Sequence, residues 1–179
     1  MVTHAVPSSM FEIIHSAYDL AYLMEEVRIT YKGDVKISLA NIHIDSKEGD
    51  IASIQRWIAK VLSSENLVEI QESETSSYVS RALNRERIAK PHDLSAVDAD
   101  FYVRVNDYLR GLRERDRENL MISINSFVTS RLEKIVKLAA ASPLSPELGE
   151  KLSAEERYLY NIVHEYTDSF KKKVIKRFD

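Results

Sequence analysis

The chain has 179 residues, with 25 lysines and arginines against 28 aspartates and glutamates, no cysteine and only four glycines. The lack of cysteine excludes disulfides, thiolate metal sites and thiol nucleophiles, and four scattered glycines cannot build a glycine-rich phosphate loop. With 44% apolar residues, the chain can fill the core of one domain or of two small ones.

The N-terminal part of the chain begins with an apolar run that predicts a helix over residues 11–24. Apolar residues then alternate with polar ones over residues 27–31 and 35–39, which predicts two strands. Gly33 and Asp34 lie between these strands and suit a tight turn. The sequence therefore predicts a β-hairpin after the first helix.

The alternation slips by one residue before Ile42 and Ile44, which indicates either a β-bulge or a turn into a third strand. After a polar loop, Asp50 is suited to cap a helix over residues 51–62, where apolar residues repeat at spacings of three and four. One more short strand is expected over residues 67–70.

The C-terminal part of the chain follows helical spacing almost throughout. Helices are expected over residues 78–88, 101–112, 120–139 and 153–174. Pro91 and Pro143 end two of them. Ser153 and Glu156, three residues apart, form the pattern of a capping box at the start of the last helix.

The fold class that follows is α+β, with a small N-terminal β-rich module before an all-α antiparallel helical bundle domain. The module is expected over residues 1–71 and the bundle over residues 78–179. Residues 72–77 are polar and form a short linker between them.

Motifs of catalysis and of metal binding are missing from the sequence. The five histidines are scattered without an HExxH pair, and no serine lies in a G-x-S-x-G or S-x-x-K motif. We therefore expect no catalytic, cofactor or metal site. Residues 1–10 lack the features of a secretory signal, and the apolar stretch at 17–24 is too short to span a membrane, so a cytoplasmic protein without membrane contact is expected.

The end of the last expected helix is rich in cations. Cations at a helix C-terminus complement the helix dipole, and they are also a candidate contact for nucleic acid. The same helix is apolar over more than one face between residues 158 and 163, which suggests a protein partner. The candidate nucleic-acid contacts are Lys171, Lys172, Lys173, Lys176 and Arg177.

Three segments of the helical half resemble signatures of GINS complex subunits. They are an acidic-Phe-Tyr segment, an Arg-x-x-Lys-Ile helix end and a Leu-Ser-x-x-Glu helix start, in the family's order over about residues 76–175. The resemblance implies structural or interface roles for Asp100, Phe101, Tyr102, Arg131, Lys134, Ile135, Glu155, Glu156 and Tyr160.

The first half is similar to the small B domain that GINS subunits carry beside their helical A domain. The similar segment places Trp57, Ile58 and Leu62 in the core of the module. The A-domain signatures resemble the subunit type in which the B domain usually follows, whereas this chain places the B-like module first. The subunit type is therefore left open.

The resemblance implies a non-catalytic scaffold subunit of an archaeal-type GINS complex that acts in DNA replication. Its implied partners are other GINS subunits, in a homo- or hetero-tetramer, together with the MCM helicase and a DHH-type RecJ-like protein. Weak DNA binding is a further expectation, and no cofactor is implied.

Two alternatives remain open at this point. A transcriptional regulator with a winged-helix-like module and a helical dimerisation domain would also contain helix, hairpin and helix. Its electrostatics are unfavourable, because residues 1–71 carry ten carboxylates against six cations, and the expected recognition helix offers only Arg56 and Lys60. An enzyme without a recognisable motif is the other alternative.

Overall fold

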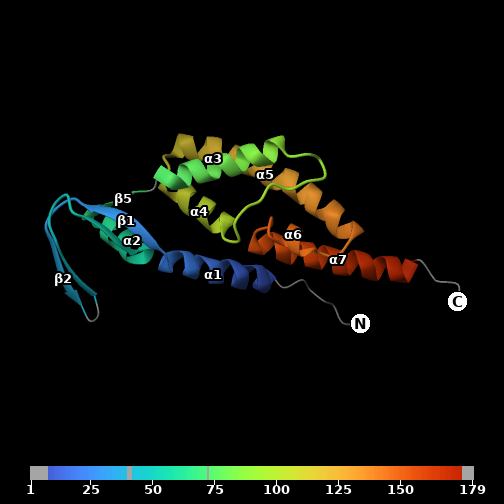
Figure 1. Ribbon diagram of the computed structural model, residues 1–179, viewed down its shortest axis with the longest axis horizontal. Coiled ribbons are helices and arrows are strands. Elements are labelled where there is room, and N and C mark those ends of the chain that lie inside the picture. Colours follow the sequence, from blue (N-terminus) through green and yellow to red (C-terminus); the bar gives the residue numbers. More distant parts are fainter. Residues whose placement is uncertain (1–7, 40–41, 72, 175–179) are drawn as a thin grey trace. The chain divides into compact units, whose positions relative to one another are not determined.

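The computed structural model describes residues 8–39, 42–71 and 73–174 (Figure 1). It is a mixed α+β structure, as expected, with a strand-rich N-terminal region before a helical C-terminal region. The elements in chain order are α1 (Ser8–Met24), β1 (Glu26–Tyr31), β2 (Val35–Leu39), β3 (Ile42–Ser46), β4 (Ile51–Gln55), α2 (Arg56–Ser64), β5 (Val68–Ile70), α3 (Ser73–Ile88), α4 (Phe101–Gly111), α5 (Glu114–Ala141), α6 (Pro146–Gly149) and α7 (Ala154–Val174).

The chain divides into two compact units. Among the described residues, the strand-rich unit lies within 19–76, and the helical unit comprises residues 8–18 and 77–174. This division differs from the expected module of residues 1–71, because the first half of α1 packs against α7. The expected linker is also shorter than predicted, since α3 begins at Ser73, and residue 72 lies outside the described residues.

The sheet of the strand-rich unit has β1 at its centre, with β4 and β5 antiparallel on its two sides. The alternation of β1 sends Val27, Ile29 and Tyr31 into the core, where each is less than a tenth exposed. Helix α2 adds Ala59 and Leu62 to the same core. The apolar residues of β1 thus organise the whole unit.

The expected hairpin between β1 and β2 is wrong. Strand β2 pairs with β3, with Ile37 opposite Ile44, so the third strand is confirmed as the cause of the slip in alternation. The residues between these strands lie outside the described part of the chain. Both edges of β1 are occupied by β4 and β5, which leaves none for β2. The Asp34 side chain instead accepts a hydrogen bond from the Glu48 amide at 3.1 Å.

The expected helix over residues 51–62 is wrong in its first half. Ile51–Gln55 form β4, and the helix begins at Arg56. The Asp50 carboxylate accepts from the Lys47 amide at 2.8 Å within a turn and does not cap the helix. The spacing of Ile51 and Ile54 suits a helix locally, but pairing with β1 satisfies the backbone groups of both strands.

The helical unit contains two groups of core residues. In the first, α3, α4 and α5 meet around Phe101 and Phe127, whose ring centroids are 5.1 Å apart. In the second, the C-terminal half of α5 packs on the segment around α7 through Ile135, Leu152 and Tyr160. Both groups are apolar, and charged residues lie between them.

The last helix starts as the sequence predicts. Ser153 Oγ accepts from the Glu156 amide at 3.2 Å, and the Glu156 carboxylate accepts from the Ser153 amide at 3.1 Å, which completes a capping box. Arg131 of α5 contacts Glu156 of α7, and Ala139 contacts His164 further along. Residue numbers rise together along both helices, so α5 and α7 are parallel, and this pair differs from the antiparallel packing expected for the bundle. The segment with α6 returns the chain to the start of α7 (Figure 1).

Candidate functional site

Four charged side chains meet in the interior of the helical unit. Glu86 comes from α3, Arg131 and Lys134 from α5, and Glu156 from α7. Each is at most 9% exposed. We refer to these four residues as the buried ion cluster. Its two cations and two carboxylates balance, as burial of charge requires.

Arg131 occupies the centre of the cluster. Its Nε and Nη2 donate to the two carboxylate oxygens of Glu156, each at 2.7 Å. Its Nη1 donates to Glu86 Oε2 at 2.9 Å and to the Ser95 carbonyl at 2.8 Å, and Nη2 also donates to the Lys151 carbonyl at 3.1 Å. A guanidinium has five N–H donors, so every donor has an acceptor. Arg131 therefore ties three helices and two loops together.

Glu86 is the carboxylate that joins α3 to α5. Its Oε1 accepts from Lys134 Nζ at 2.6 Å, while Oε2 also accepts from the Ser95 amide at 3.0 Å and the Ser95 hydroxyl at 2.8 Å. Burial alone would raise the pKa of Glu86. The hydrogen bonds from Lys134 and Ser95 and the charge of Arg131 outweigh burial, so the pKa lies below its ordinary value.

Tyr102 adds a phenol to the cluster from α4. Its hydroxyl donates to Glu156 Oε1 at 2.8 Å. Burial and the adjacent charge of Glu156 both raise the pKa of Tyr102 well above its ordinary value, so the phenol stays a donor. Glu156 therefore binds α4, α5 and the start of its own helix at once.

The lowered pKa of Glu86 predicts an acid-sensitive contribution to stability. The ionised form stabilises the fold fully above the unfolded pKa, about 4.5, and this contribution is lost as the pH falls through the lower folded pKa. We expect Glu86→Gln to lower the free energy of unfolding at neutral pH and to flatten its decline below about pH 4.5. Urea titrations at several pH values measure both effects.

The matched control for this prediction is Glu118→Gln, an exposed carboxylate near the start of α5. It should lower the free energy of unfolding at neutral pH much less than Glu86→Gln does. An acid profile that is the same with and without Glu86 would contradict the assigned role of the carboxylate.

The structure distributes the nine residues that the sequence singled out in the helical unit over more than one setting. Phe101, Ile135 and Tyr160 are fully buried in the two core groups. The Tyr160 hydroxyl donates to the Ser142 carbonyl at 2.9 Å. Asp100 pairs with Arg104 at 2.8 Å on a partly exposed face. Tyr102, Arg131, Lys134, Glu155 and Glu156 lie in or beside the buried ion cluster.

Glu155 also connects the first helix to the last one. Its Oε1 lies 3.1 Å from His15 Nδ1, and Oε2 accepts from the Ser153 hydroxyl at 2.9 Å. Phe11 packs edge-on against Tyr158, with ring centroids 4.8 Å apart. These two contacts dock the first half of α1 on the start of α7.

Two residues of the site were missed by reasoning from the sequence. Glu86 and Ser95 hold the cluster to α3 and to the loop that follows it. A signal for Glu86 existed, since it shares a helical face with the buried Val79 and Ala82. The partners of Arg131 and Lys134 are carboxylates distant in sequence, and not the neighbouring Glu133 that simple intrahelical pairing would use.

The expected core of the small module is only partly right. Leu62 is buried and Ile58 packs against the core. The placement of Trp57 in the core is wrong, because its side chain is 39% exposed and its indole donates to Gln55 Oε1 at 2.7 Å. The buried face of α2 is formed by Arg56, Ala59 and Leu62. Trp57 lies outside this face of the helix.

The cations at the end of α7 are exposed. Lys171 donates to the Ala140 carbonyl, and Lys172 pairs with Asp168 at 2.6 Å. Lys176 and Arg177 lie outside the described residues. Both described contacts stabilise the helix or its packing, and nucleic-acid contact by this segment stays a prediction.

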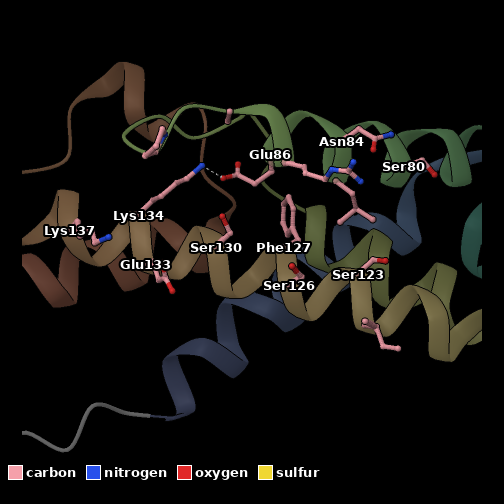
Figure 2. A pocket seen from close by; sticks show the side chains of 15 residues that line it. Ser80, Asn84, Glu86, Ser123, Ser126, Phe127, Ser130, Glu133, Lys134 and Lys137 are labelled. Atoms are coloured by element: carbon pink, nitrogen blue, oxygen red, sulfur yellow. Dashed lines mark hydrogen bonds and ion pairs between the residues drawn. The ribbon is translucent and has the colours of Figure 1, made fainter.

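A groove of about 760 Å³ lies beside the buried ion cluster, between α3 and α5 (Figure 2). Small polar side chains line it along both helices, and the Glu86–Lys134 ion pair and Phe127 lie at its base. The small polar residues are Ser80, Asn84, Ser123, Ser126 and Ser130. The groove is the candidate binding site of the helical unit.

The buried ion cluster stabilises the fold, because its carboxylates and guanidinium form hydrogen bonds with one another. Within the described residues, no group of three histidine, aspartate or glutamate side chains could hold a metal ion. In that same part of the chain, no helix has the length and apolar character needed to cross a bilayer. No family model matches the chain, and no curated protein sequence matches it significantly.

Proposed function

We propose that the chain is a non-catalytic, cytoplasmic scaffold subunit of a GINS-type complex, which links the MCM helicase to other replisome proteins. The observation that carries the proposal is the gathering of the three signature segments. One residue of each segment, Tyr102, Arg131 or Glu156, takes part in one hydrogen-bond network, in which all five donors of Arg131 are satisfied. Such an arrangement suits a rigid framework for assembly.

Exposed apolar side chains on α7 support an assembling role. Tyr166, Phe170 and Val174 follow each other at intervals of four residues and are 50%, 66% and 61% exposed. We refer to these three residues as the α7 stripe. Exposed apolar stripes of this kind mark surfaces that other proteins cover. In a GINS-type tetramer, helices of neighbouring subunits would cover the α7 stripe.

The burial of Arg56 favours the scaffold over the DNA-binding regulator. Its guanidinium lies 3.9 Å from the centre of the Tyr22 ring, and its side chain is 8% exposed. A recognition helix must direct its cations to phosphates. Of the two cations on α2, Arg56 is therefore buried inside the strand-rich unit and is not directed outward to a phosphate.

Light scattering of the full chain, alone and mixed with candidate GINS subunits, tests the proposal. We expect a tetramer in one of these samples. Changing Tyr166 and Phe170 together to glutamate should weaken assembly at least ~100-fold, because each buried aromatic contributes about 1.5–3 kcal/mol.

Ile88→Glu is the matched control for the assembly experiment. Ile88 is also an exposed apolar residue of the helical unit, at 82%, but it lies outside the α7 stripe. It should leave assembly unchanged. A monomer at micromolar concentration that ignores every candidate subunit would refute the proposed function.

A further inference from the structure

We propose that the groove between α3 and α5 binds a helix of a partner protein, and that an acidic side chain of this helix pairs with cations at one end of the groove. The inference concerns a second surface, since α7 contributes no residue to the lining of the groove. It does not rest on assembly through the α7 stripe.

Several small side chains line the groove, and they leave enough space for a helix to bind there. Ser123, Ser126 and Ser130 line the groove from α5, and Ser80 and Asn84 line it from α3 (Figure 2). The three serines span about 10 Å at 1.5 Å per residue, which is two turns of helix. These five small side chains leave room for another helix between larger lining residues such as Leu83, Arg87 and Ile122.

The polarity of the groove favours a peptide over an enclosed apolar ligand. Serine hydroxyls, the Asn84 amide and charged side chains line the walls, while Leu83, Ile122 and Phe127 supply apolar surface. Drug-sized ligands are usually bound in mostly apolar pockets that surround them. An amphipathic helix can pack small residues against Phe127 and offer polar ones to the serines.

Lys134 supplies the observation that points to an anionic group. Its side chain is only 10% exposed and lines the groove. An ammonium group has three N–H donors, and the described partner of Lys134 is a single oxygen of Glu86. Two donors of a nearly buried cation are thus available beside the groove.

The charges in the lining of the groove support a carboxylate as the partner group. Three cations, Arg87, Lys134 and Lys137, and two carboxylates, Glu86 and Glu133, line the groove. Both oxygens of Glu86 already accept hydrogen bonds. The remaining balance is positive, and Arg87 and Lys137 are exposed and able to reach an acidic side chain.

The test uses backbone amide NMR of the full chain with a synthetic, lactam-stapled, alanine-rich helical peptide that carries two glutamates on one face. The peptide has about 16 residues, because shorter helices are marginal in water. We expect saturable shifts confined to α3 and α5 along the groove. A counterpart peptide with lysines in place of the glutamates should bind at least tenfold more weakly.

Two substitutions locate the binding surface. Ser126→Trp fills the groove, and Thr129→Trp on the same helix places an equal side chain outside its lining. We expect Ser126→Trp to weaken binding at least tenfold and Thr129→Trp to leave it unchanged. Lys137→Glu, at an exposed position, should also weaken binding without disturbing the fold.

Three outcomes would overturn the proposal. Absence of groove-confined shifts at millimolar acidic peptide would do so, as would equal binding of the lysine peptide. Inorganic phosphate that saturates the same amides as tightly as the acidic peptide would show a site for free anions and would exclude a helix-binding groove.

Discussion

Replacing Arg131 by methionine should lower the free energy of unfolding of the helical unit by about 3–5 kcal/mol. The substitution removes all five donors and leaves two nearly buried carboxylates facing each other without the central cation. Lys134 still pairs with Glu86, but the donors that remain to Glu156 among the described residues are neutral, the Tyr102 hydroxyl and the Ser153 amide. Urea denaturation followed by circular dichroism measures the loss.

The matched control for this change is Arg113→Met. The Arg113 side chain is 91% exposed and pairs with Asp116 at 3.2 Å on the surface. Exposed ion pairs contribute about 0–1 kcal/mol, so the control should be nearly as stable as the unmodified chain. Equal losses in the two variants would contradict the central role of Arg131.

A triple variant distinguishes two causes of the destabilisation by Arg131→Met. One is the loss of the hydrogen bonds of Arg131, and the other is the burial of carboxylates without a cation. If Arg131→Met destabilises mainly by leaving carboxylates unpaired, adding Glu86→Gln and Glu156→Gln should recover a large part of the loss. Glutamine keeps an acceptor oxygen for the Ser95 and Tyr102 hydroxyls. A triple variant less stable than Arg131→Met would show that the carboxylates stabilise the fold through other contacts.

The long helices in the C-terminal part of this protein could be predicted because their signals are local. The capping box of Ser153 and Glu156, the proline stops and the apolar spacing of α5 all act within a few residues. The strand pairing could not be predicted so well. Which partner β1 takes depends on β4 and β5, and pairing at a distance leaves no local signal. The spacing of Ile51 and Ile54 is compatible with a helix as well as a strand, and pairing with β1 makes this segment a strand.

The candidate site was predicted in some of its members but not in its connections. A resemblance over short segments identified Arg131, Lys134 and Glu156, yet it could not say that they touch. The partner on α3, Glu86, lies 45 residues before Arg131 in sequence, and only packing of α3 beside α5 brings them together. The groove is likewise a product of two helices, and its serines look like ordinary surface residues in the sequence.

The strand-rich unit should depend in a similar way on Ile29. This side chain is fully buried at the centre of the sheet, between Ala52 of β4 and Ile70 of β5. Ile29→Ala leaves a cavity that the two flanking strands cannot close without breaking their pairing. We expect a loss of about 2–5 kcal/mol in the stability of this unit.

Hydrogen exchange resolved by residue distinguishes this effect from that of Arg131→Met. The core residues around Ile29 are separate from those of α5, so the amides of β1 should lose protection in Ile29→Ala while those of α5 keep it. Ile51→Ala, at an exposed position of β4, is the control and should cost less than about 1 kcal/mol. Loss of protection in β1 and α5 together would mean that the two units unfold as one, and the stability assigned to each would then belong to the whole chain.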